Sequence, residues 1–200
     1  MTALIDYGAG NTRSVGNALD RLGAAWTLTS SPAELDRAER VILPGVGAAA
    51  SAMAALRDRG LVDWLRATEQ PLLGVCLGLQ LLYERSEERD ASGNDTECLG
   101  LLPGTVRRFP DAGVPVPHMG WNTLRLTAPT PLLDDLVDGA HLYFVHAFAA
   151  PVGPETRATC HYAGVEFSAV VERGRVAATQ FHPEKSADAG AAILRNFLAR

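Results

Sequence analysis

The chain has 200 residues, 47% of them hydrophobic and 20% charged, and its 18 basic and 23 acidic side chains give a net charge of −5. A chain of this length can bury a full apolar core without disulfides or metal ions, and we expect one domain spanning residues 1–200. The acidic balance argues against a protein that binds nucleic-acid phosphates. No apolar run reaches the roughly 18 residues that a membrane-spanning helix requires.

The three cysteines do not form a pattern typical of disulfides or zinc sites. Cys76, Cys98 and Cys160 are widely spaced and odd in number, and none belongs to a C-x-x-C pair. We therefore expect reduced thiols, a cytoplasmic location, and neither a metal nor a cofactor.

Strand-like and helix-like segments alternate through the first 80 residues. The apolar runs that predict strands are residues 3–6, 25–29, 40–43 and 72–76. The segments that predict helices are residues 12–22, a turn beginning at Ser31 with Glu34 as its capping-box partner, and residues 48–59 and 61–67. This β-α-β-α order with fully apolar strands predicts an α/β fold, an open and mostly parallel sheet with helices on both faces.

The second half of the chain has a different character. A helix over residues 77–85 is expected to end in a charged, solvated loop at residues 84–95. Between residues 101 and 181, short apolar runs alternate with turn signals such as Pro103-Gly104, which predicts antiparallel strands added to the parallel core. Residues 188–199 form a final amphipathic helix.

A cysteine nucleophile is predicted at the end of the apolar run 72–76. Residues 74–78 read G-x-C-x-G, the form of a nucleophile elbow with Cys76 in place of serine. Such a sharp strand-to-helix turn strains the central residue, and the flanking glycines let neighbouring backbone pass closely. The start of the new helix favours the thiolate over the thiol.

A general base with an orienting carboxylate is predicted at His182 and Glu184. Pro183 favours an extended backbone at His182, so the side chains of residues 182 and 184 face the same way. The carboxylate can then accept a hydrogen bond from one imidazole nitrogen while the other nitrogen faces Cys76.

An anionic oxygen formed during attack on an amide requires preorganised N–H donors. The elbow supplies the backbone N–H of Leu77. A second donor is expected from Gly45, Val46 and Gly47, because the two glycines around Val46 allow its peptide to turn inward or outward.

The combined motifs resemble the class I (triad) glutamine amidotransferases over essentially the whole chain. They are especially similar to one branch of that family, the glutaminase subunits of imidazole glycerol phosphate synthase, which act in histidine biosynthesis. The matching segments are residues 6–11 (DYGAGN), 44–47 (PGVG), 74–80 (GVCLGLQ), 118–122 (HMGWN), 143–146 (YFVH) and 180–186 (QFHPEKS).

The resemblance implies a flavodoxin-like α/β fold and hydrolysis of glutamine through a glutamyl thioester on Cys76. It also implies that Gln80 and the segment containing Ala147 and Phe148 bind the amino-acid end of glutamine. The family often has serine or threonine where this chain has Ala147; the change matters only if the contact is made by a side chain.

The resemblance further implies a heterodimer with a cyclase subunit folded as a (β/α)₈ barrel, which receives the ammonia. In that family, the cyclase subunit uses the ammonia to form imidazole glycerol phosphate and aminoimidazole carboxamide ribotide. Lys185 is the single lysine among the 18 basic residues, which suggests that a compact ammonium is required there. The candidate interface residues flank the open side of the triad: Tyr7, Asn11, Ser14, Trp121, Tyr143 and Lys185.

The same residues were also compared with the patterns of other functions. A dinucleotide-binding module would need a third glycine where the chain has Arg13, so that fingerprint fails. A glutaminase subunit of another ammonia-using synthase, a cysteine hydrolase without a partner, and a non-catalytic regulatory subunit of this fold stay open at this point.

Overall fold

Five parallel strands form the centre of the fold, four of them at the apolar runs that predict strands in the first 80 residues. The computed structural model describes all 200 residues. Its eight-stranded sheet has the order β2-β1-β3-β4-β14-β13-β12-β9, and the first five strands are parallel. The parallel strands are β1 (Thr2–Ile5), β2 (Trp26–Thr29), β3 (Arg40–Gly45), β4 (Leu72–Cys76) and β14 (Val176–Thr179).

Antiparallel strands extend this sheet, and the other strands form two smaller sheets. The extension consists of β9 (Arg125–Leu126), β12 (Thr156–Tyr162) and β13 (Val165–Arg173). A two-stranded ribbon pairs β8 (His118–Thr123) with β10 (His141–His146). A four-stranded sheet has the order β11-β7-β5-β6, from β5 (Tyr83–Arg89), β6 (Asp95–Glu97), β7 (Leu102–Arg108) and β11 (Phe148–Ala149).

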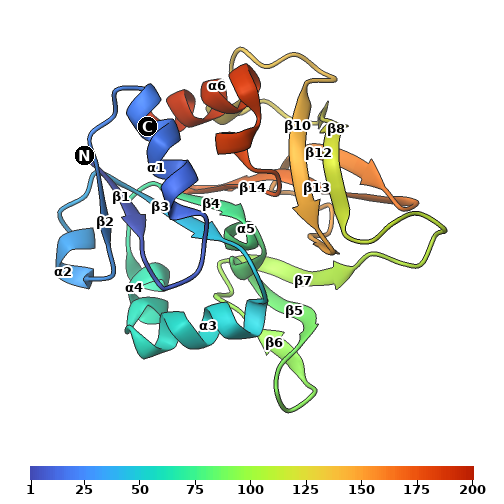
Figure 1. Ribbon diagram of the computed structural model, residues 1–200, viewed down its shortest axis with the longest axis horizontal. Helices are drawn as coiled ribbons and strands as arrows, with labels where there is room; N and C mark the ends of the chain where they lie inside the picture. Colours follow the sequence, from blue (N-terminus) through green and yellow to red (C-terminus); the bar gives the residue numbers. More distant parts are fainter.

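Helices cover both faces of the large sheet, which confirms the predicted α/β class (Figure 1). One face carries α3 (Ala49–Asp58), α4 (Leu61–Ala67) and α5 (Leu77–Leu81), and the other carries α1 (Thr12–Arg21) and α6 (Ala187–Leu198). The remaining helical turns are α2 (Pro32–Leu35), η1 (Pro131–Leu133) and η2 (Pro183–Lys185). None of the helices has the length and apolarity needed to span a bilayer.

Each face of the sheet has its own apolar core, because strand side chains alternate between faces. Ile5, Leu43 and Leu79 belong to the core under α3, α4 and α5. Leu4 and Phe181 belong to the core under α1 and α6. Two filled faces hold the parallel strands rigidly, so that groups at their carboxyl ends have fixed positions.

Three expectations about the elements are wrong. The charged residues 84–95 form β5, a turn and β6 rather than a helix end and loop, so α5 stops at Leu81. Ser31 makes no side-chain hydrogen bond at the start of α2, so the capping box is absent. Finally, β14 was included among the antiparallel additions, but it pairs in parallel with β4 and belongs to the central sheet.

Candidate active site

Three adjacent parallel strands bring the predicted catalytic groups to one edge of the sheet. β4 lies between β3 and β14, and all three run in the same direction. Cys76 ends β4, Val46 and Gly47 follow β3, and His182 comes three residues after β14. Residues far apart in sequence therefore meet at the carboxyl edge, where open α/β sheets place their ligand sites.

Cys76 has the strained backbone predicted for an elbow. Its φ is +55°, in the region that residues with a side chain rarely adopt. The turn is tight enough that a Cβ on Gly78 would lie 2.1 Å from the Leu43 carbonyl oxygen. A Cβ on Gly74 would lie 2.8 Å from the carbonyl oxygen of Gly78. The glycines at 74 and 78 thus permit the close approach that the motif predicts.

His182 and Glu184 form the predicted pair. His182 has an extended backbone, and its Nδ1 lies 2.8 Å from Oε1 of Glu184. Both side chains are almost completely buried, with 2% and 1% of their surfaces exposed. Nε2 of His182 has no hydrogen-bond partner, which leaves it available for the thiol of Cys76 or for a substrate atom.

The charge environment of His182 favours its protonated form. Burial alone lowers the pKa of the imidazole, but contacts with Cys76 and Glu184 outweigh that effect and raise the pKa to about 10. A protonated His182 beside Cys76 is the partner that a thiolate needs. The pair can therefore supply both a nucleophile and a proton donor.

A cavity of about 380 Å³ opens over these groups. Its walls include the cysteine and histidine of the predicted triad, three of the four expected oxyanion residues and the expected substrate-binding residues. The lining residues are Val46, Gly47, Cys76, Leu77, Gln80, Glu88, Pro117, Val145, His146, Ala147, Phe148 and His182.

The expected oxyanion residues divide into two groups. Val46, Gly47 and Leu77 line the cavity, and Gly47 has a φ of +91° that suits glycine. Gly45 does not line it. A Cβ on Gly45 would lie 2.6 Å from the backbone nitrogen of Gly78, so this glycine is needed for packing of β3 against the elbow.

Two polar side chains in this region were not predicted as site residues. Glu88 lines the cavity from β5, and its Oε2 accepts a hydrogen bond of 2.6 Å from the backbone of Ala49. Buried Gln180 lies between Gln80 and Cys76, with its Nε2 3.9 Å from the sulfur. The motif at residues 180–186 contains Gln180, but the charged segment of Glu88 was interpreted as a loop.

The expected interface residues lie in different environments. Trp121 is 54% exposed, its ring packs edge-on against Tyr143, and Nζ of Lys185 lies 5.8 Å from the centre of the Tyr143 ring. Asn11 and Ser14 are half-buried on the opening turns of α1. Tyr7 is fully buried, and its hydroxyl donates a 2.8 Å hydrogen bond to the Pro44 carbonyl.

Tyr7 is therefore wrong as a surface residue for a partner. Its side chain packs inside the molecule beside β3, at the strand that leads to Val46. Its burial also raises the pKa of the phenol, with a further increase from Cys76. The Tyr7 side chain therefore supports β3 from inside the molecule and is not exposed to another chain.

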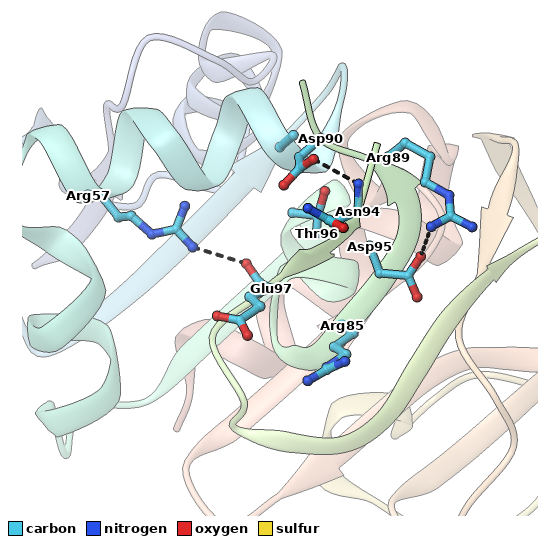
Figure 2. A pocket seen from close by; sticks show the side chains of 9 residues that line it. Arg57, Arg85, Arg89, Asp90, Asn94, Asp95, Thr96 and Glu97 are labelled. Carbon is cyan, nitrogen blue, oxygen red and sulfur yellow. Dashed lines mark hydrogen bonds and ion pairs between the residues drawn. The ribbon is translucent and has the colours of Figure 1, made fainter. Parts of the chain in front are cut away.

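A second pocket, of about 540 Å³, lies between α3 and the β5–β6 hairpin (Figure 2). Two of its arginines are paired with groups inside the pocket. Arg57 donates to the Glu97 carbonyl oxygen, and Arg89 lies 2.9 Å from Asp95. The pocket contains neither cysteine nor histidine, so the catalytic chemistry belongs to the smaller cavity over Cys76.

Comparisons with known proteins match the chain over nearly its whole length. Residues 3–200 match the family described as glutamine amidotransferase class-I. A protein from Xanthomonas euvesicatoria pv. vesicatoria, named imidazole glycerol phosphate synthase subunit HisH, is 54% identical over 98% of this chain and 96% of its own length. The protein of the same name from Xylella fastidiosa (strain Temecula1) is 50% identical over the same shares.

Solved structures show the same fold at low sequence identity. A crystal structure titled glutamine amidotransferase has a TM-score of 0.73 at 21% identity and covers 98% of this chain and 97% of its own. A chain from the PurLQS structure of Thermotoga maritima has a TM-score of 0.67 at 19% identity and covers 99% of this chain and 97% of its own.

Proposed function

Because the chain belongs to the class-I glutamine amidotransferase family, we propose that it hydrolyses glutamine and serves as the glutaminase subunit of an imidazole glycerol phosphate synthase in histidine biosynthesis. The observation that carries this proposal is the alignment of strained Cys76 with the buried His182–Glu184 pair at one cavity.

The chemistry begins with attack on the side-chain amide of glutamine. The Cys76 thiolate bonds to the amide carbon, and the carbonyl oxygen becomes an anion that backbone N–H groups of Leu77 and the Val46–Gly47 segment stabilise. His182 then donates its proton to the amide nitrogen, the C–N bond breaks, and ammonia leaves. A glutamyl thioester remains on Cys76.

Hydrolysis of the thioester restores the enzyme. Neutral His182 removes a proton from water, the resulting oxygen attacks the thioester carbon, and the C–S bond breaks to give glutamate and the Cys76 thiolate. Glu184 holds His182 through Nδ1 and stabilises its protonated form throughout.

The cavity also suits the amino-acid end of glutamine. Glu88 offers a carboxylate for the α-ammonium, and Gln80 offers an amide oxygen. At Ala147 and Phe148 the polar groups on the wall are those of the backbone. A backbone contact here is independent of the serine or threonine that the family often has at position 147.

We propose that the ammonia passes to a (β/α)₈-barrel cyclase subunit bound as a heterodimer. The surface that supports this proposal is the outer face of the β8–β10 ribbon, where Met119 and Trp121 are 64% and 54% exposed beside Tyr143. Lys185 adds one cation at its edge. Exposed apolar side chains in a cluster are typical of a protein interface.

The cysteines support a reducing compartment. Cys98 and Cys160 are buried free thiols outside the cavity lining, and burial raises the pKa of each to about 12, which favours the thiol over the reactive thiolate. We propose a cytoplasmic location on this basis.

Glutamate release from glutamine tests the function. Purified chain should release glutamate slowly alone and faster with the cyclase subunit and its ligand. Rapid release that ignores the partner would favour a stand-alone hydrolase, and no release under either condition would favour a non-catalytic subunit.

A further inference from the structure

Two buried histidines lie beside the catalytic cavity, one of them, His146, in its lining, and neither takes part in the proposed chemistry. His118 on β8 and His146 at the end of β10 are opposite each other in the ribbon, and they are 3% and 5% exposed. Nδ1 of His118 lies 3.1 Å from Nε2 of His146. Desolvation lowers their pKa values to about 4 and about 3, so both rings are neutral at pH 7.

The proton positions in this pair follow from its neighbours at one end. Oδ1 of Asn122 accepts from the backbone of Thr123, so Nδ2 is the donor that lies 3.2 Å from Nε2 of His118. His118 must therefore accept at Nε2 and carry its proton on Nδ1. That proton points at Nε2 of His146, which in turn must accept.

The hydrogen bond of His146 to Phe148 leads independently to the same proton position on His146. Nδ1 of His146 lies 2.7 Å from the carbonyl oxygen of Phe148, and a carbonyl can only accept. His146 must therefore carry its proton on Nδ1. Asn122, His118 and His146 thus form a single chain of donors that runs in one direction and ends on Phe148.

The Phe148 carbonyl also fixes a group that faces the substrate. It accepts a second hydrogen bond, of 2.9 Å, from Nε2 of Gln80. Nε2 of Gln80 donates in addition to Oε1 of Gln180, at 3.1 Å. Both amide protons of Gln80 are then engaged, and its Oε1 remains as the acceptor available to a ligand in the cavity.

We propose that His146 is a positioning residue for glutamine binding: its Nδ1–H holds the Phe148 carbonyl, which in turn holds the Gln80 side chain with its oxygen available to the substrate. His118 and Asn122 act behind it, because they keep the His146 proton on Nδ1. This role rests on the proposed glutaminase function and adds residues that act through Phe148 and Gln80 rather than on the reacting atoms.

Two substitutions at one position separate this role from simple packing. In His146→Asn, the side-chain amide nitrogen can replace Nδ1 and still donate to Phe148. In His146→Gln, the amide reaches the position of Nε2 and loses that donor. Both substitutions disturb a buried ring, so a purely structural role predicts similar losses of thermal stability and similar kinetics for the two.

The test is the KM for glutamine of both variants, measured on the chain in complex with its cyclase subunit. We expect His146→Gln to raise KM about tenfold above that of His146→Asn, with a smaller difference in kcat, since one oriented hydrogen bond is lost. Equal KM values for the two variants, or a larger increase for His146→Asn, would overturn the role of His146.

A second measurement does not depend on activity or on variants. Nitrogen-15 NMR of the wild-type imidazoles should show His118 and His146 both neutral and protonated on Nδ1 at pH 7. A proton on Nε2 of either ring would contradict the chain. A wild-type complex that hydrolyses no glutamine would instead refute the proposed function, while the NMR result would still decide the proton positions.

Discussion

At the residue scale, the proposed chemistry depends on one buried ion pair beside a strained cysteine. The sequence predicted His182, Glu184 and Cys76 and their local geometry, because the motifs at 74–78 and 182–184 carry both. Glu88 was missed, since nothing near it in sequence indicates that β5 faces the cavity. Tyr7 was misplaced, because its motif does not reveal whether a side chain points inward.

The raised pKa of His182 has a consequence for stability. The folded protein holds the imidazole proton to about pH 10, whereas a free imidazole loses it near pH 6.5, so the stabilisation is complete below pH 6.5 and is lost as the pH rises toward 10. Because the contact with Glu184 helps to raise the pKa of His182, Glu184→Gln should make the free energy of unfolding decrease less as the pH rises.

Urea unfolding of wild type and Glu184→Gln between pH 7 and 8.5 measures the difference. The interval lies below the ordinary titration of tyrosine, and the buried thiols of Cys98 and Cys160 are common to both proteins, so the difference between the two pH slopes reports on His182. Equal pH slopes for the two proteins would show that Glu184 does not set the His182 pKa.

At the scale of elements, the early βα units were predicted closely and the later ones were not. The α4 and β4 boundaries agree with the structure because Gly60, Pro71 and uninterrupted apolar runs define them locally. β5 has little apolar content, and its strand structure depends on pairing with β6 across a short turn and with β7 on its other side. The weak β propensity of its own residues does not indicate that pairing.

The contact between β3 and α5 gives a sharp prediction for the elbow. Gly78→Ala would place a Cβ 2.1 Å from the Leu43 carbonyl oxygen, and backbone must move to relieve the clash. We expect a loss of about 3 kcal/mol or more of unfolding free energy, together with loss of glutaminase activity.

Gly153→Ala is the matched control. A Cβ there meets only a side-chain oxygen of Glu155 at 3.7 Å, an ordinary contact. Thermal unfolding of both variants should show a large decrease for Gly78→Ala and almost none for Gly153→Ala. Similar melting temperatures for Gly78→Ala and wild type would contradict the close packing at the elbow.

At the scale of the whole molecule, the β8–β10 ribbon has two faces in different environments. Its inner face carries buried His118 and His146, of which His146 lines the catalytic cavity, and its outer face carries Met119 and Trp121. A partner bound to the outer face would therefore lie close to the proposed glutamine site. The motif predicted Trp121 as an interface residue, whereas the pairing of the two strands needed the structure.

Trp121→Ala should weaken binding of the cyclase subunit by about 2 kcal/mol, or roughly thirtyfold in Kd, because a buried interface tryptophan is commonly a dominant contact. Val152→Ala, which shortens another half-exposed apolar side chain outside the ribbon, is the control. Calorimetric titration measures both. An unchanged Kd for Trp121→Ala would place the interface elsewhere.

Lys185→Arg tests whether the single lysine is required for coupling. The positive charge is kept, but the compact ammonium beside Tyr143 is replaced by a planar group. We expect glutaminase activity without partner to stay similar while the stimulation by the partner falls severalfold. If stimulation is unchanged, the lysine has no specific role in coupling.

Glutamate release by wild type and Cys76→Ala, each with and without the cyclase subunit and its ligand, tests the central claim most directly. We expect slow release by wild type alone, strong stimulation in the complex, and a decrease of at least about a thousandfold in Cys76→Ala under both conditions. Glutamate release that survives Cys76→Ala would contradict the thioester mechanism and the assignment of this cavity as the active site.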